Sequence, residues 1–283
     1  MQTLASLDTV LDKYDAILCD VWGVLHNGRR LYPGAAPALQ RARAAGKTVI
    51  LLTNVPKPRG PIPGQLDRMG CPRDAWDVIV TSGDATRFEL RARAPGPVFK
   101  IGPEEFDRPL WEGLGLETTT LDQARFVAIS GLNREDETPE DYADILAQAK
   151  ARDLEMICAN PDIVVRVGDR LVWCAGAVAR DYSAIGGRVI MAGKPYAPIY
   201  GLAYRELETH IGRAIDKSRI LCIGDGVPTD VAGANGQSLD CLFIASGMHG
   251  EALFSNGVLD PTKVEAALAA EGVHATYVMP DLA

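Results

Sequence analysis

The chain has 283 residues, about twice the ~150 residues typical of one domain, so we expect one large domain or two modest ones. Its hydrophobic content of 47% and charged content of 23% exclude a disordered or collagen-like chain. The net charge of −8 argues against nucleic acid as a partner, because a surface that follows a phosphate backbone needs an excess of lysine and arginine.

Neither a membrane protein nor a secreted one is indicated. No apolar run approaches the ~18 residues that cross a bilayer, and the N-terminus lacks the basic start and apolar segment of a signal peptide. The cysteines are scattered without a Cys-x-x-Cys pair, so neither a disulfide framework nor a zinc site is expected. We therefore expect a cytoplasmic protein.

The N-terminal segment alternates short apolar runs with helix-like stretches. The predicted strands are 16–19, 48–52 and 78–80, and the predicted helices are 35–45 and a stretch from 84 onward. Such alternation is typical of parallel strands joined by right-handed crossovers. The polar residues that follow the strands are Asp20, Thr53, Asn54, Thr81 and Ser82. Ligands bind at the carboxyl ends of strands in these sheets, so the polar residues mark a candidate site.

The same pattern returns near the C-terminus. The predicted strands there are 189–191, 220–223 and 242–244, with a helix that ends at 210. Between the two parts, residues 87–187 hold their own predicted strands (98–101, 126–129 and 156–159), a helix at 139–151 and a hairpin at 163–173 that turns at Gly168-Asp169. About 100 residues suffice for a separate domain. We therefore predict a discontinuous α/β core, 1–86 and 188–283, with an inserted α/β domain, 87–187.

Aspartates follow two of the predicted core strands. Asp20 ends the first strand and precedes a glycine turn, which suits a nucleophile or metal ligand, or a carboxylate that caps the turn. The segment 224–230 adds Asp225 and Asp230 after another buried strand. Mg²⁺ prefers oxygen ligands of this kind, although a loop with Asx turns explains the same residues.

Five segments, in order, resemble motifs of the haloacid dehalogenase-like hydrolase superfamily. They are DVWGVL at 20–25, LLTN at 51–54, NPD at 160–162, GKP at 193–195 and GDGVPTD at 224–230. The resemblance is closest to the class IIA branch, which includes sugar phosphatases, 4-nitrophenyl phosphatases and pyridoxal phosphatases. It implies a Rossmann-like core with a parallel sheet, and it identifies residues 87–187 as a cap domain of the C2 type.

The resemblance also implies a magnesium-dependent phosphatase of a small phosphorylated metabolite such as a sugar phosphate. Asp20 would attack phosphorus to form an aspartyl-phosphate, with Lys194 as a second catalytic residue. The Mg²⁺ ligands would be Asp20, the Trp22 carbonyl, Asp225 and Asp230. Thr53 and Asn54 would bind the phosphate, and Asn160 and Asp162 would contact the substrate. Relatives often form homo-oligomers through the cap, which makes this an expectation here.

Trp22 departs from the family pattern, because active relatives carry a second aspartate at this position as their general acid and base. An indole cannot exchange a proton near neutral pH. Three interpretations remain open: His26 replaces the acid, the substrate has an acidic leaving group, or the protein binds a phosphorylated ligand in a regulatory role. A dehalogenase is disfavoured by Asp225 and Asp230, and a dehydrogenase by the lack of a G-x-G-x-x-G motif.

Overall fold

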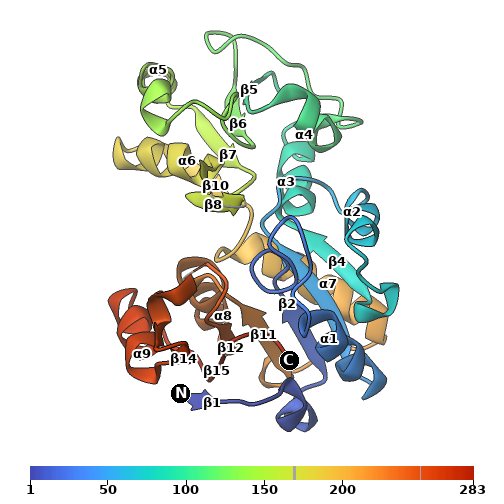
Figure 1. Cartoon of the computed structure of the whole chain (residues 1–283). Helices are drawn as coiled ribbons and strands as arrows, with labels where there is room; N and C mark the ends of the chain where they lie inside the picture. Colours follow the sequence, from blue (N-terminus) through green and yellow to red (C-terminus); the bar gives the residue numbers. More distant parts are fainter. Residues whose placement is uncertain (168–169, 249) are drawn as a thin grey trace. The chain divides into compact units, whose positions relative to one another are not determined.

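The structure is a computed structural model that describes residues 1–167, 170–248 and 250–283. The chain forms two compact units, each built on a parallel sheet (Figure 1). The first unit comprises residues 1–53, 62–80 and 200–283, and the second comprises residues 54–61 and 81–199. The mixed α/β architecture with parallel sheets confirms the predicted fold class.

Within the described residues, the first unit's sheet has the strand order β1-β15-β12-β11-β2-β3-β4. Its strands are β1 (Gln2–Thr3), β2 (Ala16–Cys19), β3 (Thr48–Thr53), β4 (Val78–Thr81), β11 (Ile220–Gly224), β12 (Asp240–Ile244) and β15 (Tyr277–Met279). β2 pairs in parallel with both β11 and β3. β3 and β11 are buried along their whole length, which explains their uninterrupted apolar sequences.

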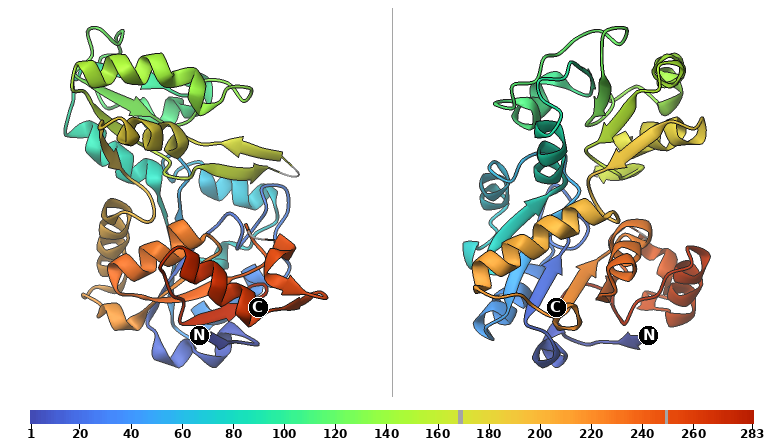
Figure 2. Two further views of the ribbon diagram at one scale, coloured as in Figure 1. Left: turned by 90° about the vertical axis from the view of Figure 1, so that its left-hand side faces the viewer. Right: turned by 180° about the vertical axis from the view of Figure 1, so that it is seen from behind.

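Helices cover both faces of this sheet. They are α1 (Ala35–Ala44), α2 (Ile62–Arg68), α7 (Ala197–Ile211), α8 (Ala232–Gln237) and α9 (Pro261–Ala270). α1 lies in front of the sheet in Figure 1, and α7 lies in front of it when the molecule is seen from behind (Figure 2). The sheet therefore lies between two layers of helices.

The second unit's sheet has the order β10-β7-β6-β5, and all its neighbours are parallel. The strands are β5 (Val98–Ile101), β6 (Phe126–Ile129), β7 (Glu155–Cys158) and β10 (Arg188–Met191), and the helices are α3 (Ser82–Arg91), α4 (Glu104–Trp111), α5 (Ala143–Ala151) and α6 (Ala175–Ala184). Val127 and Ile129 pack into a core with α5 and α6, whereas Phe126 and Ala128 pack into a core with α3 and α4. This alternation is the two-residue period of a strand covered on both faces.

β10 differs from its predicted assignment. The sequence analysis gave this strand to the core, but it pairs with β7 at the edge of the second unit's sheet. A run of four apolar residues predicts a strand but does not indicate which sheet the strand joins. The prediction therefore depended only on where the run lies in the sequence. The second unit therefore extends to residue 199, beyond the expected limit at 187. The functional division into core and cap stays a prediction.

Two antiparallel hairpins complete the described structure. β8 (Val164–Val167) pairs with β9 (Arg170–Trp173), which confirms the predicted hairpin, and its expected turn at Gly168-Asp169 lies outside the described residues. β13 (Phe254–Ser255) pairs with β14 (Val258–Leu259). Among the described residues, no helix is both long enough and apolar enough to cross a bilayer. The cysteines are buried free thiols.

Candidate active site

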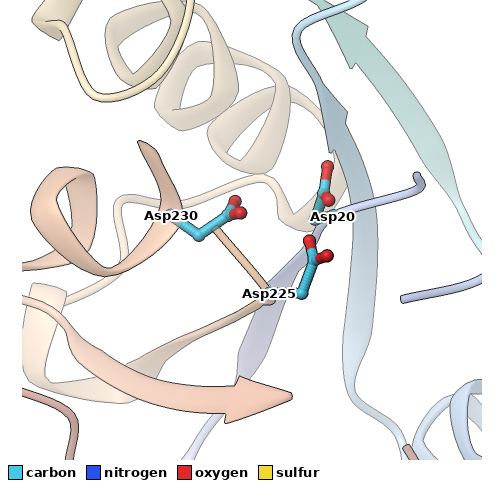
Figure 3. A group of neighbouring side chains, drawn as sticks. All are labelled: Asp20, Asp225 and Asp230. Atoms are coloured by element: carbon cyan, nitrogen blue, oxygen red, sulfur yellow. The ribbon is translucent and has the colours of Figure 1, made fainter. Parts of the chain in front are cut away.

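Three aspartates meet at the carboxyl edge of the first unit's sheet (Figure 3). Asp20 directly follows β2 and Asp225 directly follows β11, and the Asp20 amide continues the pairing of these strands by donating to the Ile223 carbonyl at 2.8 Å. Asp230 lies in a π-helical turn, Val227–Val231. One carboxylate oxygen of each aspartate lies within 4.8 Å of the others, and all three residues are buried. The structure thus brings together the three aspartates that the sequence analysis named, and their role as metal ligands stays a prediction.

The Asp225 carboxylate packs against two glycines, and a side chain at either glycine would collide with it. A Cβ atom on Gly23 would lie 2.0 Å from the Asp225 Oδ2 atom, and a Cβ atom on Gly247 would lie 2.1 Å from it. Gly23 also has a φ of +91°, which favours glycine. The Met248 amide donates a hydrogen bond to the same Oδ2 atom at 2.5 Å. The backbone of two loops therefore fixes the position of the Asp225 carboxylate.

Asp230 is held by the turn that contains it. Its Oδ2 atom accepts hydrogen bonds from the Gly226 amide at 3.0 Å and from the Thr229 hydroxyl at 3.4 Å. A Cβ atom on Gly224 would lie 2.1 Å from the Asp230 Cγ atom, so the carboxylate packs directly on the backbone at the end of β11. The turn thereby places the Asp230 carboxylate beside those of Asp20 and Asp225.

The aspartate cluster fits a magnesium ion. Carboxylates buried this close together repel one another, and a divalent cation removes that repulsion. Mg²⁺ binds oxygen ligands and commonly uses one or two carboxylates together with water and a phosphate oxygen. Asp20, Asp225 and Asp230 are oxygen donors and would hold the ion. The contribution of the Trp22 carbonyl stays a prediction.

The Trp22 side chain packs on its own loop. The loop is closed by hydrogen bonds from the Gly23 amide to the His26 carbonyl at 2.8 Å and from the His26 amide to the Val21 carbonyl at 3.1 Å. The rings of Trp22 and His26 meet edge to face, with centroids 5.4 Å apart. A Cβ atom on Gly28 would lie 2.4 Å from the indole, so the ring lies directly against the Gly28 backbone. The Trp22 side chain is thus held in place by other residues of its own loop.

The surroundings of His26 do not favour the proton-donor role that the sequence analysis considered. Its side chain is buried, and its Nδ1 atom accepts a hydrogen bond from the Gly28 amide at 3.0 Å. Burial lowers the pKa of His26 from 6.5 to about 4, although a backbone hydrogen bond offsets part of the change. The imidazole is therefore neutral at pH 7, with its acceptor nitrogen already engaged. Of the three interpretations of Trp22, these observations weigh against replacement of the acid by His26, and the catalytic role of His26 stays a prediction.

A second polar group lies in the second unit, around Asn54. The Asn54 Oδ1 atom accepts a hydrogen bond from the Lys194 amide at 2.7 Å, and its Nδ2 atom donates to the Lys194 carbonyl at 3.1 Å and to Asp162 Oδ1 at 2.8 Å. A Cβ atom on Gly193 would lie 2.4 Å from Asn54 Oδ1, so the close packing depends on this glycine. Asn54 therefore clamps the main chain that carries Lys194, which is itself 3% exposed.

Asn160 and Asp162 support the same arrangement. The Asn160 Oδ1 atom accepts a hydrogen bond from the Asp162 amide at 3.1 Å, which shapes the turn that presents Asp162 to Asn54. Ser82, which precedes this region in the chain, donates to the Ala159 carbonyl at 2.6 Å. These contacts favour a positioning role for Asn54, Asn160 and Asp162 over the direct side-chain contacts with substrate that the sequence predicted. Thr53 ends β3 in the first unit and is buried.

Sequence reasoning missed the groups that hold the carboxylates. Gly247 and Met248 follow β12. Met248 contacts Asp225 only in the folded chain, because the two residues are 23 positions apart in the sequence. In the sequence, Gly247 after a predicted strand indicates only that the chain turns there. It does not indicate which residue the turn contacts. The structure alone identifies the Met248 amide as the partner of Asp225.

Comparison with known proteins identifies relatives of the whole chain. One family model described as haloacid dehalogenase-like hydrolase matches residues 17–117, and a second described as HAD-hydrolase-like matches residues 191–283. The chain is similar to the solved structure of a haloacid dehalogenase-like hydrolase from Brucella suis 1330, with 45% identity, a TM-score of 0.86 and coverage of 98% of this chain and 99% of that one.

Two curated proteins are more distant relatives. Chronophin from Rattus norvegicus is 26% identical over 246 residues, which cover 80% of this chain and 75% of chronophin. The D-glycerol 3-phosphate phosphatase of Mycobacterium tuberculosis is 25% identical over 263 residues, which cover 91% of this chain and 71% of that protein. The motif-based resemblance is therefore confirmed by similarity over most of the chain.

Gly247→Ala should weaken magnesium binding at least tenfold, because its Cβ atom would meet Asp225 Oδ2 and displace the carboxylate. Gly236→Ala is the matched control, since a Cβ atom there meets no other atom within 4 Å. Isothermal titration of the two variants with MgCl₂ measures the difference. Equal affinities would show that Asp225 can move without loss of the ion.

His26→Gln should reduce the loss of stability in acid. The folded protein holds the pKa of His26 at about 4, so between pH 6.5 and pH 4 it binds fewer protons than the unfolded chain. The stability that His26 contributes is complete above pH 6.5 and decreases as the pH falls, by up to ~1.4 kcal/mol per pH unit. Urea unfolding across this interval measures the effect. The same pH dependence in wild type and His26→Gln, with exposed His274→Gln as control, would contradict it.

Proposed function

This chain belongs to the haloacid dehalogenase-like hydrolases, and on that premise we propose that it is a magnesium-dependent phosphatase of a small phosphomonoester. The observation that carries the proposal is the aspartate cluster, in which Asp20, Asp225 and Asp230 bring carboxylate oxygens within 4.8 Å of one another at the ends of two adjacent strands. Three buried carboxylates this close together suit a bound divalent cation better than a purely structural role.

Asp20 is the proposed nucleophile. Its carboxylate oxygen forms a bond to phosphorus while the bond from phosphorus to the leaving oxygen breaks, and water then hydrolyses the aspartyl-phosphate. Bound Mg²⁺ supplies charge neutralisation between the anionic carboxylates and the anionic phosphate. Asp225 and Asp230, with the Trp22 carbonyl, complete the proposed set of ligands. The backbone hydrogen bonds to Asp225 and Asp230 orient these carboxylates before substrate arrives.

Thr53, the Asn54 amide and Lys194 are proposed to bind the phosphate. A lysine ammonium stabilises the negative charge of a phosphoryl group throughout its transfer. The burial of Lys194 and the two hydrogen bonds between its main chain and Asn54 support this role, because they restrict the orientation of the residue. Asn160 and Asp162 contribute indirectly, through the turn that contacts Asn54.

The curated relatives support the substrate class. One of them is a phosphatase of D-glycerol 3-phosphate, a small phosphomonoester. A cytoplasmic location and self-association through residues 87–187 are further parts of the proposal, and they rest on the resemblance to class IIA relatives.

Trp22 favours a second candidate function. Without an aspartate at this position, and with His26 neutral and buried, the loop holds no group that exchanges protons near pH 7. General acid–base catalysis contributes typically ~10²–10⁴-fold to a rate. A protein without this contribution could bind a phosphorylated ligand and regulate another process. Turnover of any phosphomonoester at a useful rate favours the phosphatase, and stabilisation by ligand without turnover favours the regulatory role.

Asp20→Asn should abolish magnesium-dependent hydrolysis of 4-nitrophenyl phosphate, because the amide is neutral and a far weaker nucleophile. We expect a loss of at least ~10³-fold in kcat, with a melting temperature no lower than that of the wild type. Asp8→Asn, on the exposed surface, serves as the matched control. Retention of the wild-type rate in Asp20→Asn would exclude Asp20 as the nucleophile.

Trp22→Asp should increase kcat/KM for substrates with poor leaving groups by ~10-fold or more, since it restores a proton donor beside Asp20. Substrates with a good leaving group, such as 4-nitrophenyl phosphate, should change much less. Trp22→Asn is the control, because it has the size of aspartate without the exchangeable proton. A gain of equal size in Trp22→Asn would mean that removal of the indole, and not acid catalysis, is responsible.

A further inference from the structure

A cavity of about 300 Å³ lies at the amino edge of the second unit's sheet. The residues that line it are Arg93, Gly96, Arg125, Phe126, Glu155 and Arg188. They include the first residues of three neighbouring strands, β6, β7 and β10. Lys194 follows the other end of β10, so the cavity lies at the opposite edge of this sheet from the Asn54 group. Its volume is at the lower end of the range for sites that bind small molecules.

The strand register places three of these side chains in one row. Phe126 pairs with Glu155, and Glu155 pairs with Arg188, across three parallel strands. Side chains alternate between the two faces of a strand, so residues that pair directly project from the same face of the sheet. Phe126 packs into the core formed with α3 and α4. Glu155 and Arg188 therefore lie on that face as well.

Arg93 neutralises the carboxylate in the middle of this row. Its Nε and Nη2 atoms both donate hydrogen bonds to Glu155 Oε2, at 3.0 Å and 2.7 Å. Its Nη1 atom donates to Glu89 Oε2 at 2.9 Å, so the guanidinium is shared between two glutamates. Hydrogen bonds between charged groups of this kind are short and strong. The negative charge of Glu155 is therefore already matched by a cation of the protein.

Arg125 and Arg188 supply positive charge that the lining does not match. Within the residues that the structure describes, the exposed Arg125 guanidinium has no hydrogen bond and no ion pair. The Nη2 atom of Arg188 donates to the Asp153 carbonyl at 3.1 Å and lies 3.4 Å from Asp153 Oδ2. This ion pair is weak, because both side chains are more than half exposed and water screens them. Both arginines therefore have N–H groups to offer a ligand.

The spacing of the two arginines favours a ligand with two anionic groups. Arg125 adjoins β6 and Arg188 begins β10, and these strands are separated only by β7. Neighbouring strands lie ~4.8 Å apart, so the two backbones are ~10 Å apart. Glu155 stands between them and would repel a single anion at the centre of the cavity. Guanidinium groups bind carboxylates and phosphates through paired N–H donors, so each arginine suits one such group.

We propose that this cavity binds a small ligand that carries two separated anionic groups, carboxylates or phosphates, with one group on Arg125 and the other on Arg188. Arg93 holds Glu155 at the centre of the site, and Phe126 forms an apolar part of its wall. The inference does not depend on the proposed phosphatase activity, because every residue of the cavity belongs to the second unit and the aspartate cluster belongs to the first.

The test is isothermal titration of the full-length protein in metal-free buffer, so that no Mg²⁺ complexes the ligands. Glutarate carries two carboxylates and tripolyphosphate carries several phosphate groups, and acetate and orthophosphate are the corresponding probes with one group. We expect glutarate or tripolyphosphate to bind at least ~10-fold more tightly than its single-group counterpart, as hydrogen bonds to a second charged group provide. The tighter of the two ligands identifies carboxylate or phosphate as the preferred group.

Arg125→Met and Arg188→Met should each weaken binding of the preferred ligand by ~10-fold, because each removes hydrogen bonds to a charged group. Glu155→Gln should act in the opposite direction and strengthen binding by ~3-fold or more, since it removes the negative charge between the arginines. A gain of affinity cannot come from a loss of stability, so this variant keeps the test valid if the others fold poorly.

Arg180→Met is the matched control. Arg180 is an exposed arginine of the same unit that pairs with Asp181, and it lies on α6, which packs on the other face of the sheet. Its replacement should leave the affinity within about twofold of the wild type, as expected for a surface change. Equal affinities in wild type, Arg125→Met and Arg188→Met would overturn the inference. An equal loss in Arg180→Met would overturn it too, because it would indicate general attraction to positive charge.

Discussion

The first unit brings three buried carboxylates to one place at the end of its sheet. Two carboxylates ~4 Å apart repel by about 4 kcal/mol at an effective dielectric constant of ~20, so their proximity must be imposed by the rest of the fold. The parallel register of β2 and β11 places Asp20 beside Asp225, and the turn after β11 returns Asp230 to the same point. Gly247 is a consequence of this constraint, because it lets backbone approach Asp225 where a side chain would collide.

The hydrogen bonds around Asn54 position a main-chain segment of the second unit. Asn54 holds the main chain of the buried Lys194 at both its amide and its carbonyl. Asp162 then fixes the amide side of Asn54. The aspartate cluster brings like charges together, whereas the Asn54 group joins donors to acceptors within the protein.

Buried parallel strands could be predicted from sequence because each one is a continuous apolar run that ends in polar residues. That pattern correctly located Asp20, Asp225 and the strands beneath them, since strand ends at one edge of a sheet are necessarily close. It could not assign β10 to a sheet, because short apolar runs are interchangeable at a sheet edge. The cavity between Arg125 and Arg188 could not be predicted either, since these residues are far apart in the sequence and only the strand register brings them to one edge of the sheet.

The packing of Trp22 limits where acid catalysis could come from. The indole rests against Gly28 and meets the edge of His26, so positions 22 and 26 form one apolar contact. Burial in this contact is what keeps His26 neutral, and a neutral imidazole in turn suits the indole beside it. The two residues therefore pack together, and a substitution at either position changes the surroundings of the other. If the protein hydrolyses phosphomonoesters, the proton for the leaving oxygen has to come from outside this aromatic pair, because the indole exchanges no proton near pH 7 and burial lowers the pKa of the imidazole to about 4.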